Sequence, residues 1–128
     1  MASAALPCRT CTILYAGIAE FAARDEAGET WDAFGGAPDP IVEFAIDGVL
    51  LDGAVVCDDS FRCDFTAIQY PLNLDAGTTI EVFLSDDDVA SDDIVAYCTV
   101  AVTAELVRQG YFRCAEGAVA GVDVFIGR

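Results

Sequence analysis

Short β-forming segments separated by glycine- and aspartate-containing turns run along the whole chain of 128 residues. The segments are rich in aliphatic, aromatic and β-branched residues, and turns recur roughly every eight to twelve residues. The segments are residues 12–21, 41–46, 49–57, 61–70, 78–84, 94–103, 111–114 and 118–126. This spacing predicts an all-β fold, an eight-stranded antiparallel β-sandwich. One short helical turn is expected at 104–109, capped by Thr103 and ended by Gly110.

The length suits one domain with one hydrophobic core, since half of the chain could not bury enough apolar surface to fold alone. We therefore expect a single domain at 12–128. It is preceded by an extension at 1–11 that carries Cys8 and Cys11.

The charge balance excludes several kinds of chemistry. The chain has 22 acidic residues, six arginines, no lysine and no histidine, and its formal charge is −16. Without histidine or lysine there is no Ser-His or Cys-His dyad and no Schiff-base lysine. A charge of −16 repels phosphate backbones, which argues against nucleic-acid binding. Yet 55% of the residues are apolar, so the chain is not a disordered acidic tail.

The acidic residues are concentrated in three segments, 24–40, 57–64 and 85–93, which hold thirteen of the 22. These segments are alternate connections between the predicted strands. Alternate connections of an antiparallel sandwich lie at the same end, so we expect the three segments to meet on one rim. Converging carboxylates repel one another and need a counter-charge, which the chain's few cations do not supply. A multi-loop group of carboxylates favours Ca²⁺, which binds six to eight oxygens in flexible geometry.

Two of these segments resemble the calcium-binding loops of C2 domains. The first contains Asp32, a Gly-containing turn and Asp39 before the strand that opens at Ile41. The other reads Asp-Asp-Asp from Asp86, followed after a few residues by acids before Ile94-Val95. In an extended D-x-D phrase, alternate side chains point to one side, so Asp86 and Asp88 can bind one ion while Asp87 faces away.

The resemblance covers most of the chain and implies a ligand set. The implied ligands are Asp32, Asp39, Asp86, Asp88 and Asp93, with Ser91 as an auxiliary ligand and Asp92 as a substitute for Asp93. The substitute arises because the third segment is one residue shorter than the family pattern. The resemblance also implies a permuted, type II-like topology, in which the last strand replaces the usual first.

The same resemblance leaves the use of the rim open. Trp31 and Phe34 are candidates for membrane or partner contact at the loop tip, or for packing beneath the first acidic segment. The basic strand that many C2 domains use to bind phosphoinositides is absent, and only Arg62 stands in that region. The tryptophan-containing phrase of the family is also missing, with Asp58-Asp59-Ser60-Phe61 in its place.

Six cysteines in a small chain favour disulfides in an exported protein. Zinc binding is the less favoured interpretation of the cysteines, because Cys57 and Cys63 are spaced too widely for a pair of zinc ligands. No signal peptide is recognisable, so if the protein is exported, its leader is expected to have been removed. The resemblance to C2 domains implies that Cys98 pairs with Cys114 and that Cys57 pairs with Cys63. Cys8 and Cys11 then pair locally or with Cys57 or Cys63.

The sequence therefore predicts a non-enzymatic, calcium-binding C2-like module that is secreted or at the cell surface. Its calcium-loaded rim would contact a protein partner or support self-assembly. The alternatives are a calcium-dependent phospholipid-binding domain and a structural subunit of an extracellular assembly. The enzymatic alternatives are glycoside hydrolysis by paired carboxylates and phosphodiester chemistry supported by the calcium site, and the chain has no histidine or lysine base for either.

Overall fold

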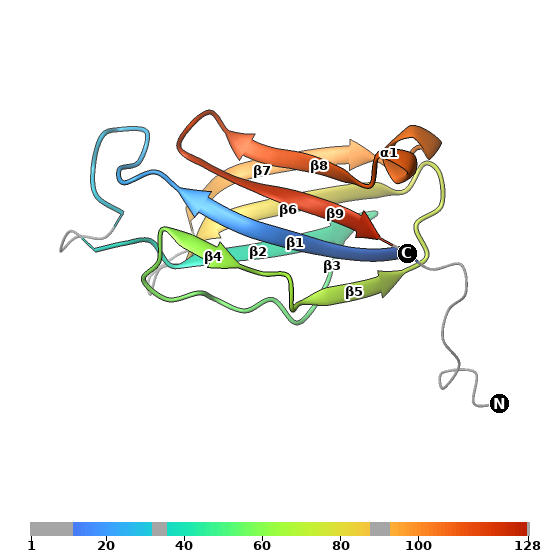
Figure 1. The fold of residues 1–128 in the computed structure, drawn as a ribbon, viewed down its shortest axis with the longest axis horizontal. Helices are drawn as coiled ribbons and strands as arrows, with labels where there is room; N and C mark the ends of the chain where they lie inside the picture. Colours follow the sequence, from blue (N-terminus) through green and yellow to red (C-terminus); the bar gives the residue numbers. More distant parts are fainter. Residues whose placement is uncertain (1–11, 32–35, 88–92, 128) are drawn as a thin grey trace.

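Two antiparallel β-sheets form the protein in a computed structural model that describes residues 12–31, 36–87 and 93–127 (Figure 1). Sheet A has the order β4 (Arg62–Asp64), β1 (Thr12–Phe21), β9 (Ala120–Gly127) and β8 (Tyr111–Glu116), and β5 (Gln69–Leu72) also pairs with β1. Sheet B has the order β3 (Val49–Leu50), β2 (Pro40–Ile46), β6 (Thr79–Asp86) and β7 (Asp93–Ala101). Helix α1 (Ala104–Gln109) connects β7 to β8.

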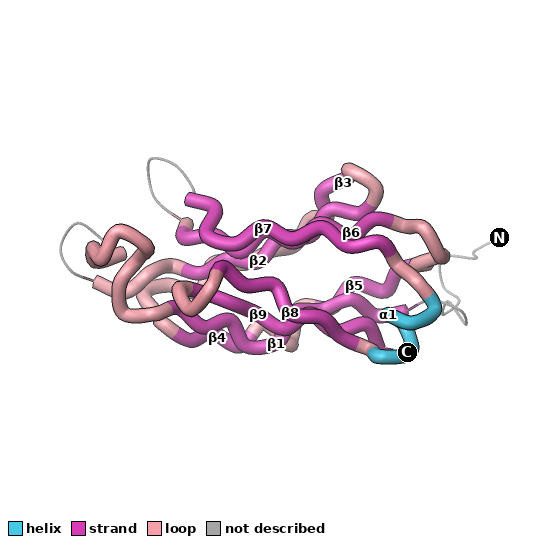
Figure 2. The backbone as a smooth tube through the Cα atoms, turned by 90° about the horizontal axis from the view of Figure 1, so that it is seen from above, coloured by secondary structure: helices cyan, strands magenta, loops and turns pink. Residues whose placement is uncertain are grey.

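The β-sandwich expected from the sequence is confirmed. Figure 2 shows the two sheets as separate layers. Nine strands occupy eight positions among the described residues, because β4 and β5 pair with successive parts of β1 at one edge of sheet A. The last strand, β9, lies between β1 and β8, as the permuted order requires.

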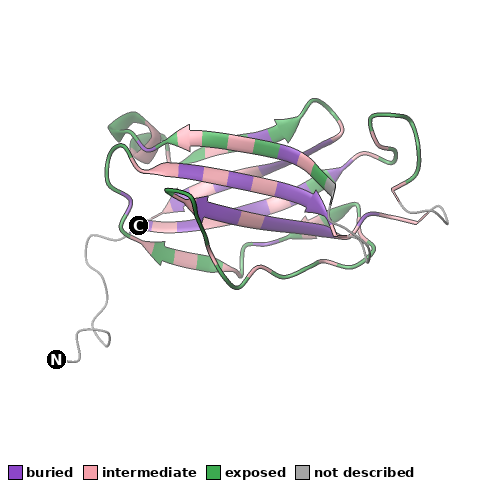
Figure 3. Ribbon diagram, turned by 180° about the vertical axis from the view of Figure 1, so that it is seen from behind, coloured by how far each residue is buried: buried purple, intermediate pink, exposed green. Residues whose placement is uncertain are grey.

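The core lies between the sheets and is built by period-two alternation along the strands. Leu14 on β1, Val82 and Leu84 on β6, and Val122 and Val124 on β9 are fully buried. Most of their neighbours along each strand are only partly buried, which gives the alternating bands of Figure 3. Strand β1 changes register against β9 between Ala16 and Ala19, and this shift interrupts the alternation.

Two predicted strands are shorter in the structure than the sequence suggested. The segment 49–57 pairs with β2 only at Val49–Leu50, and Gly53 has a φ of 102°. The segment 61–70 is split into β4 and β5, because the Asp64 carboxylate accepts hydrogen bonds from the hydroxyl and the N–H of Thr66. This turn interrupts the pairing with β1 and holds the pKa of Asp64 below its ordinary value, the hydroxyl being the larger cause.

The end of β1, the start of β2, the end of β6 and the start of β7 lie at one end of the sandwich, on the left in Figure 1, and the β3–β4 connection runs to the same end before β4 begins. We call this the acidic end. The N–H of Phe21 donates to the carbonyl of Phe61, which brings the end of β1 to the start of β4. Pro40 is paired with Asp86, which brings the start of β2 to the end of β6. Helix α1 lies at the opposite end, and no membrane-spanning helix occurs among the residues that the structure describes.

Candidate metal centre at the acidic end

Asp39 and Asp86 meet where β2 begins and β6 ends. The N–H of Asp39 donates to Oδ1 of Asp86 over 2.8 Å, and the N–H of Asp87 donates to the Asp39 carbonyl over 2.8 Å. Asp86 is only 7% exposed. It is also paired with Asp93 across the β6–β7 ladder, which places that residue's backbone beside it. Two of the three acidic segments therefore share one point of the fold.

Asp59 brings the remaining acidic segment to the same point. Its N–H donates to Oδ1 of Asp39 over 2.6 Å, and its own Oδ1 accepts from the N–H of Ala37 over 3.1 Å. The convergence of the three acidic connections is thus seen in their described parts. The donor chemistry consists of carboxylate and backbone carbonyl oxygens, which fits a hard cation such as Ca²⁺.

A cavity of about 320 Å³ opens beside Asp86. Asp25 and Glu26 line it from the β1–β2 connection, and Ile94 and Val95 line it from β7. Trp31 also borders the cavity. The lining of the cavity therefore combines carboxylates with apolar side chains.

Trp31 is held in place by the core. Its Nε1–H donates to the Ala22 carbonyl over 2.7 Å, and its ring packs edge-on against Phe21 with centroids 5.0 Å apart. These contacts match the packing role that the sequence left open for it. Phe34, the other candidate, lies outside the described residues.

Comparison with solved structures identifies the fold. Twenty-two chains match. One, described as "Extended-Synaptotagmin 2, C2A- and C2B-domains", has a TM-score of 0.64 at 13% identity and covers 99% of this chain. Another, "Structure of a C2 domain", has a TM-score of 0.60 at 10% identity, with 92% of this chain and 99% of that chain covered. This chain has the fold of a C2 domain.

A calcium-bound structure of the Extended-Synaptotagmin 2 C2A and C2B domains also matches this C2-like domain. Its TM-score is 0.61 at 14% identity, and 94% of this chain and 47% of that chain are covered. The chain spans 44% of the first-named Extended-Synaptotagmin 2 structure. No known protein-family profile matches the sequence, and no curated protein matches it.

Most of the ligand set predicted for the C2-like domain lies outside the described residues. Asp32, Asp88, Ser91 and Asp92 fall there, and Asp93 is described for its backbone alone. Asp39 and Asp86 lie next to each other, joined by the hydrogen bond from the Asp39 N–H to the Asp86 carboxylate. Among the side chains that the structure describes, no three acidic, cysteine or histidine groups gather closely enough to hold a metal. Asp39 and Asp86 are thus the two predicted ligands whose side chains the structure describes.

Both disulfides expected within the C2-like domain are present. Cys98 on β7 is bonded to Cys114 on β8, and Cys57 is bonded to Cys63 on β4. The first bond joins the two sheets, and the second closes a loop at the acidic end. Cys8 and Cys11 lie outside the described residues.

Sequence reasoning did not find the contacts of Asp59. Its residue type placed it in an acidic segment, but its bond to Asp39 is made by a backbone N–H, which every non-proline residue carries. The flanking cysteines were the available signal, because a disulfide between them fixes the loop that holds Asp59.

Proposed function

We propose that the protein is a non-enzymatic, calcium-binding C2-like module that works outside the cell or at its surface. The observation that carries the proposal is the meeting of Asp39 and Asp86 at the acidic end, through a 2.8 Å hydrogen bond. Two acidic residues from separate connections lie next to each other there, and each is in a segment that resembles a C2 calcium loop. Asp32, Asp88 and Asp93 would complete the Ca²⁺ shell, with Ser91 and Asp92 as auxiliary ligands.

Calcium would act here as a stabilising counter-ion. It would bind the folded acidic end and not the unfolded chain, so it would raise the free energy of unfolding. The calcium-bound structure among the similar C2 domains supports the choice of ion. The two disulfides support an oxidising compartment and hence export.

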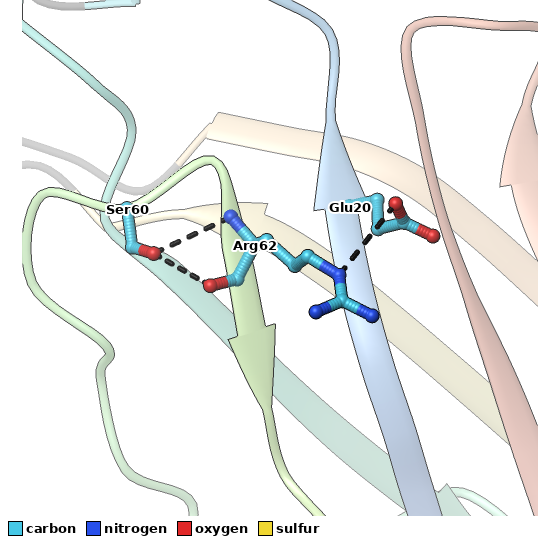
Figure 4. A network of polar contacts seen from close by, with 3 residues as sticks. All are labelled: Glu20, Ser60 and Arg62. Atoms are coloured by element: carbon cyan, nitrogen blue, oxygen red, sulfur yellow. Dashed lines mark hydrogen bonds and ion pairs between the residues drawn. The ribbon is translucent and has the colours of Figure 1, made fainter.

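The loaded acidic end would contact a protein partner or another copy of the chain. We place calcium-dependent binding to phospholipids second, because the sequence has only Arg62 in the region where many C2 domains carry a basic strand. Arg62 is 3.9 Å from the Glu20 carboxylate, and its backbone is engaged by the Ser60 hydroxyl (Figure 4). Two or three calcium ions would still leave a net negative charge, which anionic lipids repel.

Thermal unfolding under non-reducing conditions tests the proposal. Calcium at about a hundredfold excess over its Kd adds about 2.7 kcal/mol, so Tm should rise by roughly 10 °C between EDTA and Ca²⁺. Asp86→Asn combined with Asp88→Asn should abolish the rise. The matched control is Asp52→Asn with Asp75→Asn, which removes two exposed carboxylates away from the site and should keep it.

An unchanged Tm on adding Ca²⁺ to the wild-type protein would rule out calcium binding. Sedimentation with anionic and with zwitterionic liposomes, with and without Ca²⁺, then distinguishes binding to a protein partner from binding to a phospholipid membrane. Co-sedimentation that depends on calcium would favour the membrane. Its absence would favour a protein partner.

A further inference from the structure

The loop between Cys57 and Cys63, here the 57–63 loop, has no part in the predicted ligand set. Its disulfide joins residues whose Cα atoms are 6.4 Å apart. Within it, Asp59 makes both of its recorded hydrogen bonds to the β1–β2 connection. The N–H donates to Asp39 Oδ1, and the carboxylate accepts from the N–H of Ala37.

The 57–63 loop is fastened to both sheets. On one side, the N–H of Cys57 donates to the Pro40 carbonyl at the start of β2, over 2.8 Å. On the other side, Cys63 lies on β4, opposite Ala19 of β1. The N–H of Ser60 donates to the Pro38 carbonyl, also over 2.8 Å. The Cys57–Cys63 disulfide therefore joins the loop that contacts Asp39, next to β2 of sheet B, to strand β4 of sheet A.

Asp59 adopts a left-handed backbone conformation. Its φ is 52°, in the left-handed region that non-glycine residues seldom occupy, although aspartate tolerates it better than most. This conformation aims the N–H at the Asp39 carboxylate. Closing the loop covalently reduces the number of alternative conformations that compete with it.

From these contacts we infer that the 57–63 loop orients a calcium ligand. Asp59 is a positioning residue that fixes the carboxylate plane of Asp39, and the Cys57–Cys63 disulfide holds Asp59 in place. Calcium affinity therefore depends on this disulfide and not on Cys98–Cys114. The inference rests on the proposed calcium site. Partners that orient metal ligands commonly change metal affinity 10- to 100-fold.

Calcium titration calorimetry of the full chain tests the inference, at a temperature where all variants are folded. Cys57→Ala with Cys63→Ala should raise the Kd for Ca²⁺ about tenfold. Cys98→Ala with Cys114→Ala is the matched control, because it also removes one disulfide, and its Kd should stay within about twofold of wild type. Equal Kd values for the two double variants would overturn the inference.

Substitutions at Asp59 separate positioning from direct ligation. Asp59→Asn keeps the side-chain acceptor for Ala37, so its Kd should stay within about twofold of wild type. Asp59→Gly permits the same φ but loses that acceptor, so its Kd should rise about fivefold. Equal losses in the two variants would show that Asp59 acts through its charge, and would overturn the positioning role.

Hydrogen exchange of the Asp59 amide without calcium gives a readout independent of the metal. We expect a protected amide in the wild type and in the Cys98→Ala, Cys114→Ala variant, and faster exchange in the Cys57→Ala, Cys63→Ala variant. A wild type that binds no Ca²⁺ would defeat the proposed function and the inference together. A wild type that binds Ca²⁺ with unchanged affinity after loss of Cys57–Cys63 would defeat the inference alone.

Discussion

Tyr97 lies on the outer face of sheet B, where its hydroxyl donates a hydrogen bond to the Glu81 carboxylate. The bond favours the neutral phenol and raises the pKa of Tyr97 above its ordinary value. Tyr70 reaches a raised pKa by another route, since burial is the main cause and the Glu43 and Asp52 carboxylates add to it. The two tyrosines therefore report on different physical effects in one molecule.

Glu81→Gln should lower the pKa of Tyr97, because the neutral amide no longer repels the phenolate and accepts a weaker hydrogen bond. In the wild type, this bond adds stability below a pH of about 10, and the gain is lost as the pH rises through the folded pKa of Tyr97. A ¹³Cζ-tyrosine NMR titration measures the effect, with Tyr70 as the internal control. Equal shifts at both tyrosines, or none at Tyr97, would contradict the assignment of its cause.

Helix α1 is an element that the sequence predicted at its observed bounds. Thr103 is in an extended conformation, and its hydroxyl accepts from the N–H of Leu106 over 3.0 Å. Gly110 ends the helix in the left-handed region, with a φ of 84°. Both signals act within a few residues of the helix, which is why the sequence alone was sufficient to place it.

Thr103→Ala should destabilise the domain by about 1 kcal/mol, because the N–H of Leu106 loses its capping acceptor. Urea unfolding measured by circular dichroism gives the change in the free energy of unfolding. Thr103→Ser keeps a hydroxyl at the cap and should restore most of the loss. If serine and alanine destabilise the domain equally, the capping bond does not carry the effect.

Elements set by contacts between distant residues were harder to predict. Strand β1 was predicted at its observed bounds, because its apolar pattern is continuous. The break between β4 and β5 was missed, because the alternation across 61–70 gives no sign that the Asp64 carboxylate will turn the chain at Thr66. At the candidate site, the meeting of Asp39 and Asp86 followed from strand order. The bond from Asp59 to Asp39 spans 20 residues and needed the folded chain.

In the whole molecule, the two disulfides close opposite long edges of the sandwich. Cys98–Cys114 joins the edge strands β7 and β8, and Cys57–Cys63 joins β4 to the loop that bonds to the start of β2. Without calcium, a chain of charge −16 repels itself in the compact state, and these covalent bonds limit how far the sheets can separate.

The two disulfides should rank in opposite order for stability and for calcium affinity. The sequence separation is 16 for Cys98–Cys114 and 6 for Cys57–Cys63. Loop-closure entropy then assigns them about 3 and about 2 kcal/mol of stability, respectively. Urea unfolding in EDTA should therefore show the larger loss for Cys98→Ala with Cys114→Ala. The other double variant should show the larger loss of Ca²⁺ affinity.

If the loss of one disulfide gave the larger effect in both measurements, calcium affinity would simply follow stability. The opposite rankings would separate the disulfide that holds the sheets together from the one that orients the site.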